Sequence, residues 1–260
     1  MKYHHCLPYL VTLVLTLTFT YSGANAAASK ITPLGSQEGE FCQFDRALIF
    51  EDPDGTRILY DAGRTVAGAK DARLGKIDAL LVSHMHGDHV GDKHISAPVK
   101  GDCKSTAFPL SSLPNTNTLN IALEKGAKII TGSETPKFFA NKLKALGGKP
   151  GDSQLVRFGA QIKVGGVTIT TVPEVHSNSI SGHMIGGELG EMLNASGLTA
   201  HPGPPTGYVL TFSNGLVAYL SGDTGITAEQ KTVVKEHYKA TLAVINIGDS
   251  FTIGPKKPPG

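Results

Sequence analysis

Three observations predict an α/β fold for this chain. Between residues 77 and 146, segments of strand character alternate with segments of helix character. Residues 77–82 form a short, continuous apolar run, which is typical of a strand buried on both faces. Metal-binding side chains follow that run directly, where α/β active sites are built, and they are His84, His86, Asp88 and His89. A histidine-rich surface loop is the competing interpretation, and the position after a buried strand argues against it.

A β-hairpin is predicted ahead of this strand. Residues 44–50 and 56–60 are apolar segments, and the turn signal Asp52-Pro53-Asp54-Gly55 separates them. After the histidine cluster, residues 91–114 are rich in Gly, Pro, Ser and Asp, so they predict a long surface loop. The next predicted elements are helices over 118–125 and 136–146 with a strand over 127–130 between them.

The C-terminal half is predicted to contain mostly strands. Three apolar segments joined by Gly-containing turns predict strands over 155–158, 161–164 and 167–172. The last of these leads into His176, and an irregular stretch follows over 181–205. A second hairpin over 207–220 ends just before Asp223. The final predicted elements are an amphipathic helix over 226–238 and a buried strand over 242–247.

Composition limits the classes of protein that the chain can represent. Its 260 residues and near-average apolar share predict one globular domain or two closely packed halves. A formal charge of only +2 gives no electrostatic footprint for nucleic acid. No nucleic-acid partner is therefore expected, and the sequence does not indicate an oligomeric state.

The N-terminal residues resemble a secretory signal peptide. Lys2 precedes an apolar stretch, and Ala24-Asn25-Ala26 matches a small-x-small cleavage site. Residues 1–26 are thus predicted to be removed, leaving a domain over 27–260 that is exported to the periplasm or secreted. An uncleaved membrane anchor is the alternative, and the short, threonine-interrupted apolar stretch argues against it. No stable membrane anchor is expected after cleavage.

Export leaves two cysteines in the mature chain, Cys42 and Cys103. An oxidising compartment permits a disulfide between them, which we state as a hypothesis. Thiolate ligation of a metal is less favoured, because neither cysteine belongs to a Cys-x-x-Cys pair.

The ligand-bearing strand ends together resemble the metallo-β-lactamase superfamily. The pattern H-x-H-x-D-H over 84–89, a later His176 and a later Gly-Asp ending in Asp223 carry this resemblance. It implies an αβ/βα four-layer sandwich with a two-metal site along one edge. Asp61 matches the early strand-end aspartate of the family, which supports the site without binding metal.

The resemblance also implies the role of each ligand. The first ion falls to His84, His86 and His176, the second to Asp88 and His89, and Asp223 bridges both. Zinc is expected, with two ions per chain, although ligand type alone does not separate it from Mn²⁺ or Fe²⁺. No other cofactor is implied.

The implied function is hydrolysis of a small molecule by a metal-bound hydroxide. Asp88 and Asp223 are the candidate catalytic residues, because their charges offset those of the two ions that activate water and polarise the substrate. Segments around Gly207, 221–225 and 245–255 resemble the branch with ascorbate-phosphate lactonase-like proteins and N-acyl-phosphatidylethanolamine phospholipase D. This branch implies an ester, lactone or phosphodiester substrate.

The C-terminus departs from the pattern that the resemblance implies. After a segment like residues 251–255, such proteins continue through a helix and a strand to a further histidine for the second ion. This sequence ends at Gly260 without them. We therefore expect the last helix and strand to be missing and the second site to be weaker, through a shortened chain, a frameshift or degeneration. The alternative function is a catalytically impaired or non-enzymatic metal-binding remnant of the fold.

Overall fold

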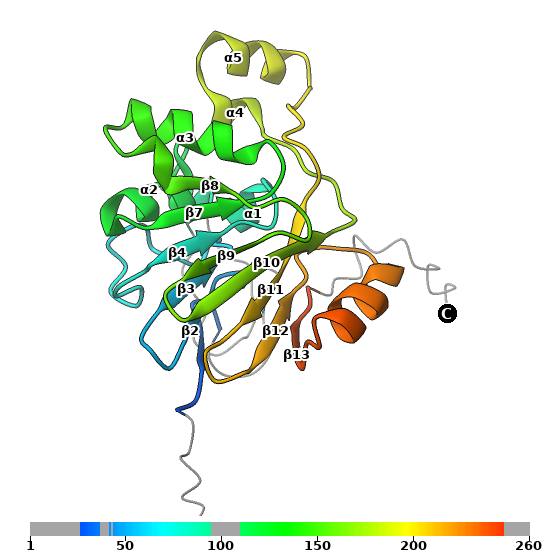
Figure 1. Cartoon of the computed structure of the whole chain (residues 1–260). Coiled ribbons are helices and arrows are strands. Elements are labelled where there is room, and N and C mark those ends of the chain that lie inside the picture. Colours follow the sequence, from blue (N-terminus) through cyan, green and yellow to red (C-terminus); the bar gives the residue numbers. More distant parts are fainter. Residues whose placement is uncertain (1–26, 37–41, 43, 95–109, 247–260) are drawn as a thin grey trace, which may run out of the picture.

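A computed structural model describes residues 27–36, 42, 44–94 and 110–246 of the chain (Figure 1). Two β-sheets pack face to face, and helices cover their outer faces. The two sheets contain six and five strands, and β5 and β6 form a separate two-stranded ribbon. The ribbon comprises β5 (Lys93–His94) and β6 (Leu110–Ser111).

The six-stranded sheet has the order β1-β2-β3-β4-β7-β8. Its strands are β1 (Lys30–Pro33), β2 (Leu48–Glu51), β3 (Arg57–Tyr60), β4 (Ala79–Leu81), β7 (Lys128–Thr131) and β8 (Ser153–Leu155). The predicted hairpin is formed by β2 and β3, which pair antiparallel. Strands β3, β4, β7 and β8 are parallel, so their carboxyl ends meet at one edge of the sheet.

The five-stranded sheet has the order β13-β12-β11-β10-β9. Its strands are β9 (Gln161–Val164), β10 (Val167–Pro173), β11 (Thr206–Thr211), β12 (Val217–Leu220) and β13 (Leu242–Val244). Strands β10 and β12 both run antiparallel to β11, and β13 runs parallel to β12. The carboxyl ends of β10, β12 and β13 therefore also lie at a common edge.

The helices are distributed over the outside of the sandwich. They are α1 (Gly87–Val90), α2 (Thr116–Lys125), α3 (Thr135–Ala145), α4 (Gly182–Ile185), α5 (Gly187–Ala195) and a π-helix over Gln230–His237. A short 3₁₀ turn, Pro150–Asp152, precedes β8. None of the described helices combines the length and apolarity that a membrane span requires.

Three apolar cores separate four layers. Helices α2 and α3 pack on one face of the six-stranded sheet, with Phe139 against the face that carries Leu80. The opposite face packs on the five-stranded sheet, where Leu81 meets Tyr208. Val234 of the π-helix packs on the outer face of that second sheet. Alternate residues of β4 thus enter different cores, as the pleat of a strand requires, and the α/β sandwich prediction is confirmed.

The structure differs from the predicted elements in several places. The stretch expected to be irregular over 181–205 contains α4 and α5, which project from one end of the sandwich (Figure 1). The strand predicted over 155–158 is β8, which ends at Leu155. The last strand was predicted to be buried, but β13 is only partly so, with Ala243 exposed.

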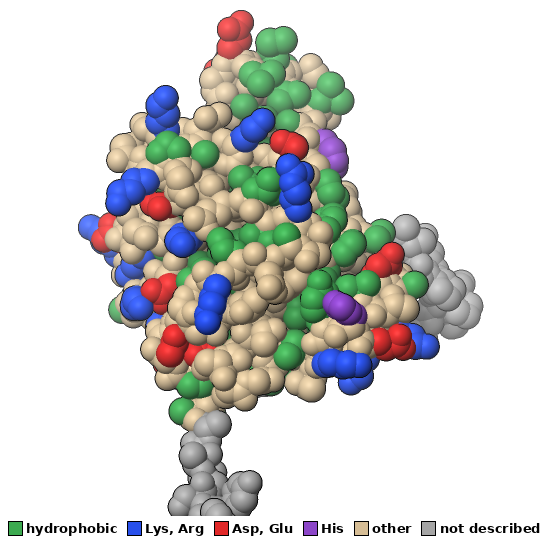
Figure 2. Space-filling model, in the orientation of Figure 1, with side chains coloured by type: hydrophobic (Ala, Val, Ile, Leu, Met, Phe, Trp, Pro, Cys, Tyr) green, Lys and Arg blue, Asp and Glu red, His purple; other side chains and the backbone are tan. Residues whose placement is uncertain are grey.

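The surface visible in Figure 2 carries both signs of charge, with apolar side chains over the projecting α4–α5 unit. Leu189 and Met192 of α5 are exposed apolar residues, and so is Leu198, which follows it. Residues 1–26, predicted to be a signal peptide, and residues 247–260, after which a last helix and strand were expected to be missing, lie outside the described residues, and so does Cys103. Cys42 is disulfide-bonded in the structure, and its pairing with Cys103 stays a prediction.

Candidate metal centre

The predicted ligands come from both sheets and meet at one edge of the sandwich. His84, His86, Asp88 and His89 follow the carboxyl end of β4 in the first sheet. His176 follows β10 and Asp223 follows β12, both in the second sheet. The backbone N–H of Thr206, at the start of β11, donates to the carbonyl of Ser83 at 2.8 Å and joins the two sheets beside the site.

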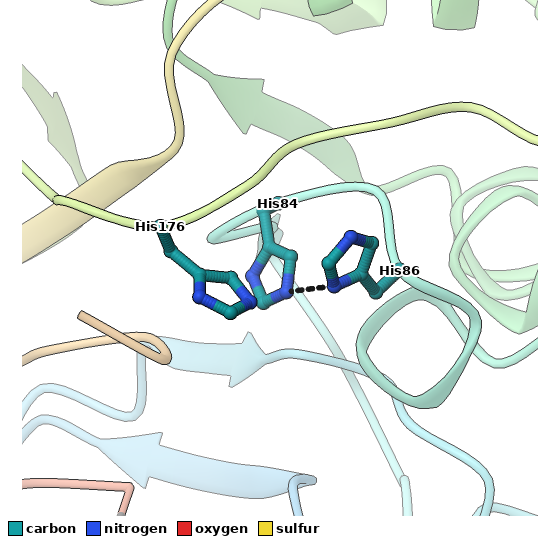
Figure 3. A group of neighbouring side chains, drawn as sticks. All are labelled: His84, His86 and His176. Atoms are coloured by element: carbon teal, nitrogen blue, oxygen red, sulfur yellow. Dashed lines mark hydrogen bonds between the residues drawn. The ribbon is translucent and has the colours of Figure 1, made fainter. Parts of the chain in front are cut away.

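Three imidazoles form the first compact group of potential ligands. One ring nitrogen from each of His84, His86 and His176 lies within 4.8 Å of the others. In Figure 3 the three rings point toward one another, and His84 Nε2 lies 3.0 Å from His86 Nδ1. His84 is buried, whereas His86 and His176 are partly exposed. This group therefore has a buried side, formed by His84, and a solvent-exposed side, formed by His86 and His176.

A second compact group shares His84 with the first. It contains His84, His89 and Asp223, whose ligand atoms also lie within 4.8 Å of one another. His89 Nε2 lies 3.2 Å from Asp223 Oδ2 and 3.5 Å from Asp88 Oδ2. Asp88 itself belongs to neither compact group among the described residues. The structure thus brings all six predicted ligands to one place but holds Asp88 at its margin.

Asp61 and Ser83 hold the two buried histidines from behind. Asp61 accepts from the Ser83 N–H at 2.8 Å and from the Ser83 hydroxyl at 2.7 Å. Its Oδ2 also lies 2.7 Å from His89 Nδ1, and the Ser83 hydroxyl lies 3.0 Å from His84 Nδ1. These contacts occupy the Nδ1 atoms and leave both Nε2 atoms directed into the site, which is how supporting residues commonly orient metal-binding histidines.

The electrostatics of the two groups differ. Burial and neighbouring imidazoles lower the pKa of His84, His86 and His176, so these rings are neutral near pH 7. Burial also acts to lower the pKa of His89, yet Asp61 and Asp223 raise it to about 10. The first group is therefore ready to bind a cation, whereas His89 must first lose a proton.

The carboxylates of the site are held in their charged form. Burial acts to raise the pKa of Asp223, but hydrogen bonding and the charge of His89 keep it well below its usual value. Asn246 supports Asp223 as well, because its side-chain amide donates to Oδ1 at 2.8 Å. The charges of His89 and Arg46 likewise outweigh burial and lower the pKa of Asp88.

Glu174 is a buried carboxyl beside the centre that sequence reasoning missed. Its Oε1 lies 3.9 Å from His84 Nδ1, and neither oxygen has a hydrogen-bond partner among the described residues. Burial, with the nearby charge of Asp61, raises the pKa of Glu174 to about 9. Gly222 has a φ of +62°, and a Cβ there would collide with the Glu174 carboxyl, so glycine is required at this position.

Asn178 connects three loops around the first group. Its side-chain oxygen accepts from the backbone N–H of Met85, which lies between His84 and His86, at 2.9 Å. Its amide donates to the Gly203 carbonyl at 2.9 Å, and its own carbonyl lies 2.9 Å from His201 Nδ1. Asn178 thereby fixes the histidine loop relative to the chain that follows His176.

Arg46 is a second feature that the sequence did not reveal. Its Nε lies 3.2 Å from Asp88 Oδ2, and its Nη2 lies 3.6 Å from Asp223 Oδ2. Arg46 precedes β2, far along the chain from both partners, so no local pattern could have linked them. Its guanidinium bridges the two carboxylates of the predicted second site.

The donor set fits a divalent cation of the zinc type. Three imidazoles converge with lowered pKa values, and the donor atoms are nitrogen and carboxylate oxygen. His89 Nε2 is buried and faces the carboxylate oxygens of Asp223 at 3.2 Å and Asp88 at 3.5 Å, so a cation bound there would have one nitrogen and two oxygen donors within reach. The residues present therefore suit the ion that the sequence pattern implies.

The sequence matches a family model and several metal-dependent hydrolases. Residues 56–254 match the sequence model of the family described as beta-lactamase superfamily domain. A UPF0173 metal-dependent hydrolase of Methanopyrus kandleri is 30% identical over 207 residues, which cover 78% of this chain and 70% of that protein. A UPF0173 metal-dependent hydrolase of Thermodesulfovibrio yellowstonii is 27% identical over 214 residues, or 80% of this chain and 67% of that protein.

A solved structure supports the fold. Igni18, a metallo hydrolase from Ignicoccus hospitalis, superposes with a TM-score of 0.50 at 22% identity. The superposition covers 83% of this chain and 69% of that one.

Proposed function

We propose that this chain, which belongs to the beta-lactamase superfamily and to its UPF0173 metal-dependent hydrolases, cleaves an ester, lactone or phosphodiester with zinc. The convergence of three neutral imidazoles, His84, His86 and His176, carries the proposal. We further propose that the protein acts after export, which rests on the signal-like residues 1–26 alone.

The proposed ligand sets follow the two compact groups. His84, His86 and His176 would hold the first ion, and His89 and Asp223, with Asp88 at the margin, would hold the second. When bound, such ions supply an activated water and polarise the oxygen of the scissile group. We assign catalytic roles to Asp88 and Asp223, since both are charged and only part-buried beside the open side of the centre.

The remaining residues keep the ligands in their reactive form. Asp61 and Ser83 bind the Nδ1 atoms, so the lone pair at Nε2 of His84 is available to a cation, and that of His89 becomes available when its ring loses a proton. His84 and Glu174 are buried and exclude water from the interior side of the centre. Substrate must therefore approach from the solvent-exposed side, where His86 and His176 lie.

The test combines metal content with activity. Replacing both His84 and His86 by alanine should remove the first ion and abolish hydrolysis of model esters, lactones and phosphodiesters. Elemental analysis should find about two ions in the loaded wild-type protein, whereas one or none with no turnover would favour the non-enzymatic remnant. Hydrolysis that persists after complete removal of metal would contradict the proposal.

A further inference from the structure

We propose that Arg46 competes with the second divalent ion for Asp88 and Asp223, so that the chain binds one ion readily and a second only when the guanidinium withdraws. The inference rests on the proposed function, because it takes the same residues as metal ligands. In this inference the guanidinium of Arg46 is a third positive charge in a centre that was expected to hold two metal ions.

The contacts of Arg46 fall on the oxygen atoms that a second ion would need. Arg46 Nε approaches Asp88 Oδ2 at 3.2 Å, and Nη2 approaches Asp223 Oδ2 at 3.6 Å. These same Oδ2 atoms are the ones nearest His89 Nε2, at 3.5 and 3.2 Å. The guanidinium therefore lies against the position that His89, Asp88 and Asp223 would share as ligands, and it satisfies both carboxylates there.

Arginine is suited to this competition because it does not lose its charge. A guanidinium stays protonated at any physiological pH. An ion at the second position must then either lie close to a fixed positive charge or displace it. The side chain of Arg46 is 17% exposed, and those of Asp88 and Asp223 are 21% and 19% exposed. These three side chains thus lie at the protein surface, where the long side chain of Arg46 can move away from the two carboxylates.

Arg46 forms no ion pair or hydrogen bond with the first group among the described residues. Its two carboxylate partners, Asp88 and Asp223, lie outside the group of His84, His86 and His176. Asp88, which Arg46 contacts at the shorter distance, is also the predicted ligand that lies outside both compact groups. Both observations agree with a centre that has one preformed ion site and a second that the guanidinium blocks.

The experiment measures Zn²⁺ binding by chelator competition for the metal-free wild type, Arg46→Gln and Arg46→Lys. Removal of the charge in Arg46→Gln should tighten the second dissociation constant by about tenfold, and Arg46→Lys should lie nearer the wild type. The first dissociation constant should stay within about twofold in all three proteins. Circular dichroism establishes that each metal-free variant is folded before titration.

Arg64→Gln is the matched control. Arg64 is also 17% exposed and also binds a carboxylate, but its partner is Asp92, at 2.7 Å. Its charge acts on Asp88 without an ion pair, so its replacement should change the second constant much less than Arg46→Gln does and should leave the first unchanged. A second constant that is unchanged or weaker in Arg46→Gln overturns the inference, and so does an equal shift in Arg64→Gln. Absence of any Zn²⁺ binding by the wild type would instead overturn the proposed function.

Discussion

Replacing Asp61 by asparagine should weaken the second metal site while leaving the first intact. Asp61 is fully buried and accepts from the Ser83 N–H, from the Ser83 hydroxyl and from His89 Nδ1, at 2.7–2.8 Å. In Asp61→Asn one acceptor oxygen becomes an NH₂ donor. If the remaining oxygen keeps the Ser83 N–H, the new amide faces His89 Nδ1, which must then accept a hydrogen bond. The ring proton is forced to Nε2, the atom that the second ion needs.

The expected magnitudes follow from the contacts that are lost. One buried hydrogen bond to a charged group contributes about 1.5–3 kcal/mol, so the free energy of unfolding should fall by about 2 kcal/mol. Loss of a group that orients a metal-binding histidine commonly weakens metal affinity about 10–100-fold. We expect this loss at the second site, because Asp61 contacts His89 directly and reaches His84 only through Ser83.

The assay is Zn²⁺ titration together with urea unfolding of the metal-free protein. Asp52→Asn is the control, because Asp52 is also buried and accepts from the N–H and hydroxyl of a serine, Ser213, both at 2.7 Å. It lies in the β2–β3 turn, at the sheet edge opposite the metal centre, so its replacement should destabilise the protein without changing metal affinity. Equal second-site affinity in Asp61→Asn and the wild type would refute the reasoning.

Three further predictions concern other parts of the centre. Asn178→Ala should weaken first-site zinc affinity about tenfold, and Asn178→Asp, which keeps the acceptor for the Met85 N–H, should weaken it less; chelator competition measures both. In the metal-free protein the pKa of His89 is raised from 6.5 to about 10 and that of Glu174 from 4.5 to about 9, so the folded state retains protons that the unfolded state releases. This contribution to stability is present at low pH and is lost as pH rises toward the raised pKa values. Urea unfolding in chelator should therefore give a lower free energy of unfolding at pH 9 than at pH 7, and the decrease should be smaller in Glu174→Gln. Tyr208→Phe should lower the free energy of unfolding by about 1–3 kcal/mol at unchanged metal affinity, because its buried hydroxyl shares one hydrogen between the backbone carbonyls of Val82, at 2.7 Å, and Ile130, at 3.0 Å. Urea unfolding with zinc titration checks this.

The ligand cluster could be predicted from the sequence because its signal is local. An apolar run followed at once by His84 and its neighbours specifies both a buried strand and its polar end. His176 and Asp223 follow further strands that patterning also identifies, so their convergence depends only on strands ending at a common edge. The face-to-face packing of the two sheets then brings His176 and Asp223 close to His84, as the structure shows.

Apart from Asp61, which the family resemblance indicated, the supporting residues could not be predicted, because their roles depend on distant contacts. Asn178 binds the N–H of Met85, which lies 93 positions earlier, and Arg46 binds Asp88, 42 positions later. No periodicity or spacing connects such pairs. Glu174 differs, because a carboxylate two residues before His176 at the end of a strand was visible, but its burial was not.

Helices α4 and α5 were missed for a compositional reason. Glycine lowers helix propensity, and the segment contains Gly182, Gly187 and Gly190. In the structure Gly182 and Gly190 let the two helices approach closely, because a Cβ on either one would collide with the backbone carbonyl of the other. The glycines that suggested an irregular stretch are thus what allows this tight helical pair.

The origin of the three histidines in different sheets has a consequence for the whole molecule. His84 and His86 extend from the first sheet and His176 from the second, so an ion held by all three would tie the two halves of the sandwich together. Opening either sheet would then break the ion's coordination, and release of the ion would remove a link between segments far apart in the chain. Higher metal occupancy should consequently make the slow opening motions of the sandwich rarer, and slower exchange of the amide protons at the carboxyl ends of β4 and β10 would report this.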